Sequence, residues 1–178
     1  MSGFEINVNL AGLSAYLDGM REKVEAAVRP AAQAGAEVLY RAVKVNVAGI
    51  GRKTGNLDSA IYQAFSEKQS RKGRAVYRVS WNLKKAPHGH LVEYGHIQRY
   101  KVYMGRDGNW YTAVRPEMRG KPKPKHNAPA SVKDAYYIPL ATPKQIAARS
   151  FIRKAWASHR DAAEQAMRAS YLSSLGLE

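Results

Sequence analysis

The chain has 178 residues, 45% of them hydrophobic, and a formal net charge of +15, which suits one domain with a real core and excludes wholesale disorder. It has no cysteine, which excludes disulfides and thiolate metal sites and fits synthesis in the cytoplasm. No apolar run approaches the roughly 20 residues of a membrane helix, and the first residues do not resemble a signal peptide.

A long helix is the first predicted element, over about residues 10–47. Apolar residues recur there at intervals of three and four, so they form one stripe that would be buried against the core. Pro30 lacks an amide hydrogen and clashes with the preceding turn, so we expect the helix to kink or break there. Gly49 and Gly51 should end it. The predicted stripe consists of Leu13, Leu17, Met20, Val24, Val28, Ala31, Ala34, Val38, Ala42 and Val45.

The glycine-rich turn at residues 49–55 invites comparison with a phosphate-binding loop. A P-loop follows a strand and has a Lys and then a Ser or Thr after its last glycine. Here a helix is predicted before the turn, and Lys53-Thr54 precedes the last glycine, so nucleotide binding is not predicted. Asn56 is expected to cap a single helical turn, with Leu57 buried beneath it.

A β-hairpin is predicted after this turn. Its first strand covers residues 61–65, and its second covers 75–81, where alternate residues from Tyr77 to Trp81 share one face. This period of two is typical of half-buried strands. The connecting turn at 69–74 carries basic residues, which would project into solvent or toward a partner.

Three histidines and one acid lie near the middle of the chain. Together, His88, His90, His96 and Glu93 offer the imidazole and carboxylate groups that bind zinc, but glycines loosen the backbone and the spacing shows no supporting order. We therefore favour a structural role, in which the two apolar residues before Glu93 enter the core. Glu93 would then accept hydrogen bonds or pair with a nearby cation, and Tyr94-Gly95 would turn the chain.

The next region contains a predicted aromatic hairpin and a basic arm. Strands at 100–104 and 110–114 flank an Asp107-Gly108 step, which suits a tight turn. Four prolines between residues 115 and 130 prevent a helix or a central strand, so this arm should be extended. Aromatic residues beside Lys and Arg fit either a platform for single-stranded nucleic acid or a two-faced hairpin within an assembly. We favour the assembly.

The last predicted elements are a short strand and a long helix. Residues 135–140 form the strand, with Pro139 at an edge or end. The Thr142–Gln145 stretch has a capping-box pattern, which predicts a helix start, although a break near Ser150 would move that start to Phe151. The apolar residues at helical spacing are Ile146, Phe151, Ile152, Ala155, Trp156, His159, Ala163, Ala166 and Met167.

The positive charge is concentrated in residues 52–125, which hold 17 Lys or Arg and 5 acids. Such an imbalance implies a polyanionic or acidic partner. The count does not distinguish DNA from an acidic protein surface. The candidate contact residues are Arg71, Lys72, Arg74, Arg119, Lys121, Lys123 and Lys125.

Three short strings, at residues 52–61, 91–95 and 150–155, resemble in order and spacing the tail-component family of long-tailed bacteriophages, the tail-completion or neck proteins. The resemblance spans about residues 13–167. It departs from the family where His96 replaces a usual Thr and Ser150 replaces a usual Pro. The residues that carry it are Thr54, Gly55, Asn56, Leu57, Ser59, Ile61, Glu93, Tyr94, Gly95, Phe151, Ile152 and Ala155.

The resemblance implies an α+β fold with a mostly antiparallel sheet and long N- and C-terminal helices packed on one face. One domain would cover residues 1–178, with an insertion (hairpin and Pro/Lys-rich arm) at about 97–134. The implied role is a structural virion protein that forms a ring, commonly sixfold, at the head-proximal end of the tail and helps join head to tail. Its expected partners are a head-completion protein, a tail terminator or tail tube, and genomic DNA in the channel.

The resemblance further implies assembly in the host bacterial cytoplasm, with no membrane, catalytic residues, metal or cofactor. The alternative is a stand-alone protein that binds nucleic acid without sequence preference. A nuclease using His88, His90 and Glu93 is disfavoured, because metal-dependent nucleases generally need clustered carboxylates.

Overall fold

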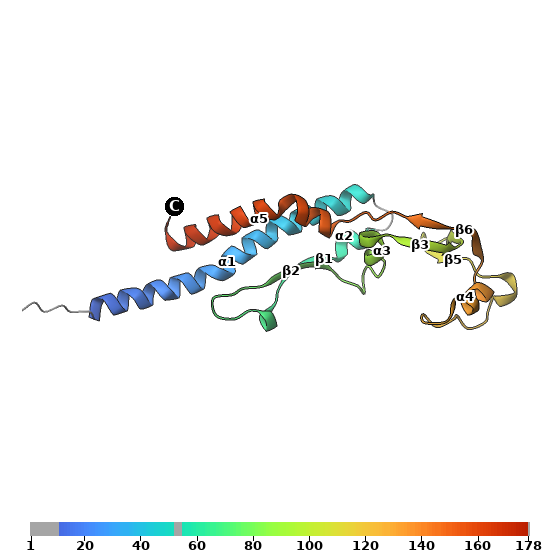
Figure 1. Cartoon of the computed structure of the whole chain (residues 1–178), viewed down its shortest axis with the longest axis horizontal. Coiled ribbons are helices and arrows are strands. Elements are labelled where there is room, and N and C mark those ends of the chain that lie inside the picture. The colour runs from blue at the N-terminus through green and yellow to red at the C-terminus, as the bar shows by residue number, and fades with distance from the viewer. Residues whose placement is uncertain (1–10, 52–54, 178) are drawn as a thin grey trace, which may run out of the picture.

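The computed structural model describes residues 11–51 and 55–177. A helical body occupies one end of the elongated molecule, and a smaller lobe extends from the other (Figure 1). The helices are α1 (Ala11–Ile50), α2 (Asn56–Ala60), α3 (Gly89–Tyr94), α4 (Ala130–Tyr136) and α5 (Ile152–Leu175). The strands are β1 (Ile61–Phe65), β2 (Tyr77–Trp81), β3 (His96–Tyr100), β4 (Val102–Met104), β5 (Trp110–Thr112) and β6 (Pro139–Ile146). Outside the described part lie Thr54 and the side chains of Leu13 and Leu17.

Helix α1 runs through Pro30 as one helix, so of the two expectations for this proline, a kink or a break, the break is absent. A proline removes one backbone hydrogen bond and costs about 3 kcal/mol in a helix interior. The turns on either side of it are held by packing, because Ala27 and Ala31 are 1% and 7% exposed. Burial of these turns offsets the local cost and keeps the helix in one piece.

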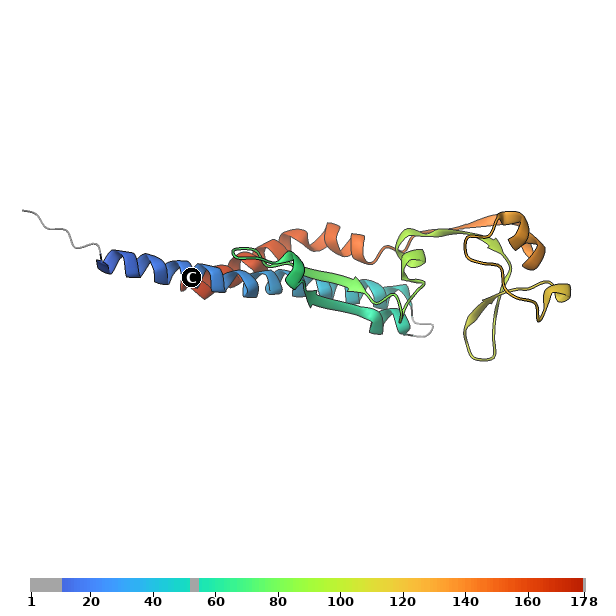
Figure 2. The same ribbon diagram turned by 90° about the horizontal axis from the view of Figure 1, so that it is seen from below.

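Helices α1 and α5 lie side by side (Figures 1 and 2). They come close at Gly35, where an added Cβ would lie 3.0 Å from the carbonyl oxygen of Ala163 and 2.4 Å from Cγ of Met167. The buried residues of α5 are alanines. The predicted stripe on this helix is therefore partly wrong, because Trp156 is 58% exposed and His159 is also exposed. A contact this close buries only a narrow line of small side chains.

The buried side of α1 also differs from the predicted stripe. Val45 is 71% exposed and Met20 is 46% exposed, whereas Val43 and Val47 are buried. The predicted stripe assumes that the same face of the helix is buried along its whole length. The real contacts of α1 shift around the helix axis, because α5 and the β1–β2 hairpin approach it from different directions.

The predicted β1–β2 hairpin is confirmed, with antiparallel register from Ile61↔Trp81 to Phe65↔Tyr77. It packs against α1, and the main core lies where α1, the hairpin and the start of α5 meet; Figure 1 shows these elements together. The ring of Phe151 meets that of Trp81 edge to face, with centroids 5.6 Å apart. The buried cluster comprises Ala42, Val43, Val47, Ile61, Phe151 and Ala155.

The α+β class is confirmed, with long helices near both ends and antiparallel strands between them. In the described part of the chain, the strands form three separate two-stranded ribbons: β1–β2, β3–β6 and β4–β5. Only the first of them packs extensively on the helices. The other two build the lobe.

We call residues 96–146 the distal lobe. The chain enters it along β3 and returns along β6, which pair antiparallel from His96↔Ile146. Three backbone hydrogen bonds then close a junction: the N–H of Lys101 donates to the carbonyl of Ile138 at 2.9 Å, that of Ile138 to Ala113 at 3.0 Å, and that of Ala113 to Lys101 at 2.8 Å. This junction fixes the base of the β4–β5 ribbon to the rest of the lobe.

Two predictions for this region are wrong. Ala135 and Tyr136 end helix α4 rather than opening a strand, and Thr142–Gln145 lies within β6 rather than at a helix start. Pairing with β3 supplies backbone partners along β6, and this tertiary contact overrides the local capping pattern. Helix α5 begins instead at Ile152, directly after Phe151, as the resemblance implies.

Candidate functional site

Glu93 connects the middle of the chain to the start of α5. Its side chain is 2% exposed. Oε2 accepts hydrogen bonds from the backbone N–H groups of Phe151 and Ile152, at 2.7 and 3.0 Å, and Oε1 accepts one from that of Arg153 at 3.0 Å. The first amides of a helix have no partner inside it, and its dipole also favours a negative charge there. Glu93 therefore caps α5 from a distant part of the sequence.

Arg153 neutralises this buried carboxylate. Its Nε donates to Oε1 of Glu93 at 3.1 Å, and its Nη2 donates to the carbonyl of Glu93 at 2.6 Å and to Oγ of Ser150 at 2.8 Å. The guanidinium lies 4.7 Å from the centroid of the Tyr94 ring. Glu93 was expected either to accept hydrogen bonds or to pair with a cation. Both are confirmed, because it accepts backbone hydrogen bonds and also pairs with Arg153. A buried charge needs such partners to offset its desolvation.

Several of the other motif residues lie around this cap or in the core beside it. Phe151 is fully buried, as expected, and Leu57 is half-buried against the same cluster. Gly95 has φ +73°, and an added Cβ would lie 2.6 Å from the carbonyl oxygen of Ile146, so only glycine fits this turn into the lobe. The three strings therefore meet in space, and the contacts between them hold the fold together.

The turn before β1 differs in one detail from the prediction. Asn56 is the first residue of α2, and the cap position is Gly55, with φ 74° and no side-chain cap hydrogen bond. Ser59 is exposed, and its Oγ donates to the carbonyl of Asn56 at 3.1 Å. The hydrogen bond between Ser59 and Asn56 thus lies within the local turn.

The three histidines do not surround a common point with Glu93. That carboxylate is occupied by α5, and Nδ1 of His90 lies 2.8 Å from the carbonyl oxygen of Pro87. Within residues 11–51 and 55–177, no group of three or more His, Cys, Asp or Glu side chains could hold a metal ion.

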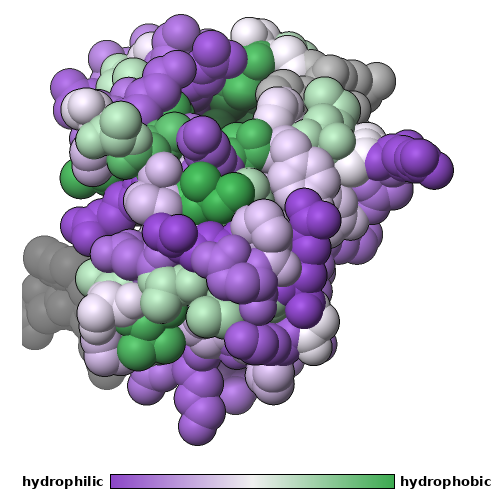
Figure 3. Space-filling view, turned by 90° about the vertical axis from the view of Figure 1, so that its right-hand side faces the viewer, coloured by the Kyte–Doolittle hydropathy of each residue, from purple (hydrophilic) through white to green (hydrophobic). Residues whose placement is uncertain are grey.

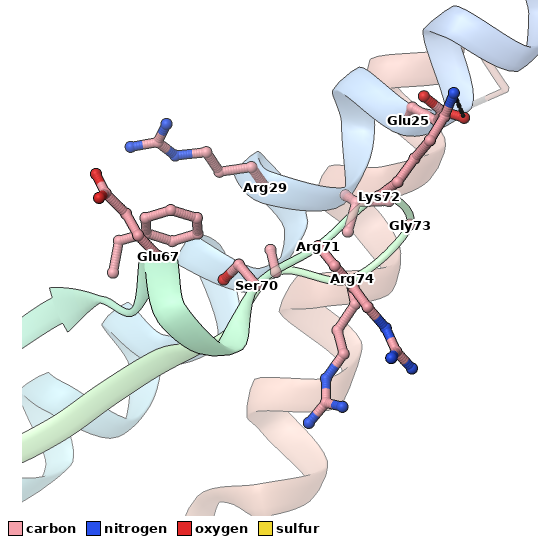
Figure 4. A pocket seen from close by; sticks show the side chains of 11 residues that line it. Glu25, Arg29, Glu67, Ser70, Arg71, Lys72, Gly73 and Arg74 are labelled. Atoms are coloured by element: carbon pink, nitrogen blue, oxygen red, sulfur yellow. Dashed lines mark ion pairs between the residues drawn. The ribbon is translucent and has the colours of Figure 1, made fainter.

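The tip of the β1–β2 hairpin is basic and exposed, and it folds back against α1. Nζ of Lys72 lies 3.2 Å from Oε1 of Glu25. The side chains of Arg71 and Arg74 point away from this pair (Figure 4). A shallow groove of about 420 Å³ runs between the tip and α1. The hairpin therefore presents two guanidinium groups to the outside beside a partly apolar groove.

We call residues 115–129 the basic strap. Its backbone is anchored, because the hydroxyl of Tyr136 donates to the carbonyl of Lys121 at 2.9 Å and Nζ of Lys133 donates to that of His126 at 2.6 Å. No described carboxylate pairs with its four candidate cations. These exposed side chains are Arg119, Lys121, Lys123 and Lys125.

We call residues 102–112 the finger, because this β4–β5 hairpin projects from the lobe away from α4 (Figure 2). The predicted turn is confirmed, with φ +75° at Gly108. Hydrogen bonds from the Tyr111 hydroxyl and from Asn109 lower the pKa of Asp107, and the same Tyr111–Asp107 contact raises the pKa of Tyr111. The finger exposes large apolar side chains at 42–56%: Val102, Tyr103, Met104, Trp110 and Tyr111.

The end view of the lobe mixes hydrophobic patches with hydrophilic side chains (Figure 3). No helix of the described chain is long and apolar enough to cross a membrane.

Sequence reasoning did not single out Ser150 and Arg153 as site residues. Both belong to the third string, but their partner Glu93 lies about 60 positions earlier, where it accepts hydrogen bonds from Oγ of Ser150 and Nε of Arg153. One sequence without its fold offers no signal that pairs residues over such a distance. The cap depends on the packing of α3 against the start of α5, which only the tertiary structure shows.

Residues 11–95 match the family model described as "Bacteriophage HK97-gp10, putative tail-component". The match agrees with the family to which the sequence strings pointed, and it covers a little under half of the chain. No curated protein and no solved structure matches the chain. The matched region contains α1, the β1–β2 hairpin and α3, and it ends where the distal lobe begins.

Proposed function

Because residues 11–95 match a family of phage tail components, we propose that this chain is a tail-completion or neck protein of a phage or prophage virion. It would sit at the head-proximal end of the tail and help join head to tail. The family match is the observation that carries this proposal. The apolar motif residues and Glu93 support a structural role, because they are used in the core and in the cap of α5.

The proposed organisation is a single domain with an insertion. The chain leaves the helical body at β3 and returns at β6, and the matched region ends just before this excursion. An insertion held by an antiparallel stem can vary without disturbing the body. The distal lobe is therefore proposed as the part that adapts this protein to its own virion.

Copies of the chain are proposed to form a ring, with the sixfold symmetry that the resemblance implies. The elongated shape gives a long lateral surface for neighbouring copies (Figure 1). Ribbons β3–β6 and β4–β5 both have free edges within the described chain, and contacts between copies in a closed ring would cover such edges.

Two basic surfaces are proposed to contact the neighbours of the ring. They are the hairpin tip, with Arg71, Lys72 and Arg74, and the strap, with Arg119 and its three lysines. Their partners would be a head-completion protein, a tail terminator or tail tube, or genomic DNA in the channel. The exposed cations of both surfaces, which in the strap stand on an anchored backbone, support either kind of polyanionic contact.

Deletion of the gene in its phage or prophage tests the proposed function. We expect filled heads and separate tails in electron micrographs, with joining restored by a plasmid copy. The protein should also be detected in purified particles, where averaged images should show a ring. Normal joined particles without the protein would contradict the proposal.

The alternative of a stand-alone nucleic-acid-binding protein is favoured only by the charge. It predicts binding to duplex DNA that falls steeply with salt, together with absence from virions. Particles that contain the protein at a fixed copy number would exclude it.

A further inference from the structure

We propose that residues 4–10 of one copy add as a strand to the outer edge of β2 in a neighbouring copy, with their apolar side in the groove between β2 and α5. This inference rests on the proposed function, because it names the contact that would join copies in the ring. The contact involves two different parts of the chain, so it can repeat head to tail until the ring closes.

The N-terminal sequence has the pattern of an amphipathic strand. Residues 4–10 read Phe-Glu-Ile-Asn-Val-Asn-Leu, so apolar side chains occupy the even positions and polar side chains the odd ones. This period of two is typical of a strand with one buried face. A single strand of this kind needs a sheet edge for its backbone and an apolar surface for one side.

The outer edge of β2 can supply the backbone partners. In the described part of the chain the β1–β2 sheet has two strands, so no third strand covers this edge. The N–H of Asn82 donates to the carbonyl of Ala60 at 2.9 Å, in the register of the ribbon. Because hydrogen-bonded and non-hydrogen-bonded pairs alternate along an antiparallel ribbon, Tyr77, Val79 and Trp81 direct their N–H and C=O groups away from β1.

An apolar groove lies at the start of this edge. It has a volume of about 550 Å³ and is enclosed by α1, α5 and the chain that leads into β2. Its apolar lining includes Val28 of α1, Ala75 before β2, and Met167 and Tyr171 of α5. Met167 is 38% exposed, so an apolar strand would cover it. The charged residues in the lining are Arg74, Glu164 and Arg168.

Residues 4–10 of the same copy do not reach this groove. On α1, Val28 and Ala31 come 17 and 20 positions after Ala11, which is about 26–30 Å along the helix axis. Seven residues of strand that double back from Ala11 span only about 23 Å. The N-terminal end of α1 also projects beyond the end of α5 (Figures 1 and 2). The strand in the groove must therefore come from another copy.

The charges of the two surfaces are complementary. Residues 2–10 contain one acid, Glu5, and no Lys or Arg, so they can approach a chain of net charge +15 without bringing like side-chain charges together. Val79 and Trp81 pack against the core, so Arg78 and Ser80 face away from it. The polar side of the added strand, with Glu5, would lie on that outer face, where Arg78 is exposed.

Disulfide trapping in assembled particles tests the inference. The chain has no cysteine, so every disulfide comes from an introduced pair. Asn7→Cys combined with Arg78→Cys or Ser80→Cys places both thiols on the outer face of adjacent strands. Oxidation should then give a ladder of covalent oligomers on a non-reducing gel.

The matched controls combine Asn7→Cys with Ala64→Cys or Tyr62→Cys, the β1 residues opposite Arg78 and Ser80. They would lie one strand farther away, beyond the Cα separation of about 7 Å that a disulfide can span, and should remain monomeric. A ladder from the controls alone, bands that stop at a dimer, or monomers throughout would each overturn the inference.

Substitutions in the donated strand give a second readout. Ile6→Asn with Val8→Asn removes much of the apolar side and should lower the crosslinked fraction of the Asn7/Arg78 cysteine pair about tenfold. Asn9→Ser keeps the alternation and should leave that fraction unchanged. Equal crosslinking in the two variants would overturn the inference while leaving the proposed function intact. Absence of the wild-type protein from particles would instead contradict the proposed function, and the inference with it.

Discussion

At the scale of single residues, the chain depends on one buried carboxylate. Glu93 satisfies three amides of α5 and one guanidinium while it is almost wholly removed from water. A charge in such a place is costly unless its partners are complete. Here the partners are complete, so the middle string and the last helix stabilise one another.

Replacing Glu93 with Gln should destabilise the protein by about 2–4 kcal/mol. The amide keeps the shape of the side chain but brings N–H groups against amide donors and leaves Arg153 without its counter-charge. Urea denaturation measures the change. Glu67→Gln is the control, since Glu67 is exposed on the hairpin and should shift stability by less than about 0.5 kcal/mol. Equal effects of the two variants would show that the cap contributes little.

Truncation of Phe151 tests the core that this cap holds in place. Phe151→Ala removes a fully buried ring and should cost about 3–5 kcal/mol. Leu57→Ala should cost less, because Leu57 is only half-buried. Thermal unfolding of the two variants gives the order. Near-wild-type stability of the Phe151 variant would mean that α5 does not pack as described.

At the scale of elements, the connections between body and lobe depend on backbone geometry. Gly95 combines a positive φ with a close approach to the strand that returns from the lobe, while Gly108 has a positive φ in open space. Both positions favour glycine, but only at Gly95 would an added side chain also meet the backbone of Ile146.

Gly95→Ala should destabilise the protein by more than about 2 kcal/mol, because the strain of a backbone conformation that is essentially confined to glycine, φ 73° with ψ 173°, adds to overpacking. Gly108→Ala should cost only the strain, about 1–2 kcal/mol of finger stability, without affecting the body. Urea denaturation reports the body, and NMR chemical shifts report the finger. If the body of the Gly95 variant were as stable as wild type, the turn into the lobe would not be constrained by Ile146.

The turn of the finger should depend on pH through Asp107. Its folded pKa is lowered by hydrogen bonds from Tyr111 and Asn109, so the contribution of Asp107 is fully present above the unfolded value of about 3.9. It is lost as pH falls from there through the folded pKa. NMR signals of Tyr103 and Tyr111 should therefore change at acidic pH. In Asp107→Asn this change should disappear; its persistence would assign the effect to another group.

At the scale of the whole molecule, charge is arranged separately from the core. The helical body holds the buried cluster, whereas the strap and the hairpin tip carry exposed cations at the surface of the elongated molecule. The strap is anchored through its backbone, so its lysines can be removed without loss of structure. They are therefore suitable for a test of attachment.

Changing Lys121, Lys123 and Lys125 together to Gln should impair head–tail joining while leaving thermal stability unchanged. If these lysines bind DNA phosphates, the slope of log affinity against log salt should also fall by about one unit per lysine. If they bind an acidic protein, DNA affinity should remain unchanged. The matched control changes Lys23, Lys84 and Lys154, which are equally exposed elsewhere. Fully infectious particles from the strap variant would exclude both contacts.

The local elements that were predicted well have strong signals of their own. The β1–β2 hairpin follows from its period of two, and the finger follows from its aromatic strands and the Asp107-Gly108 turn. The start of α5 at Ile152 followed from the family strings, whereas the capping pattern at Thr142–Gln145 pointed to the wrong place. That pattern is a weak local preference, and pairing between β3 and β6 outweighs it.

The hairpins and the concentration of charge could be predicted from the sequence by itself, because they depend on residues close together or on simple counts. The family resemblance could also be read from the sequence, from the order and spacing of three short strings, and it implied the α+β class. Only the tertiary structure decided that Glu93 caps α5, that α1 continues through Pro30, and that Trp156 and Val45 face outward. Each of these depends on which surfaces meet in space. A carboxylate, a proline or an apolar side chain has the same local pattern whether or not a distant element packs against it.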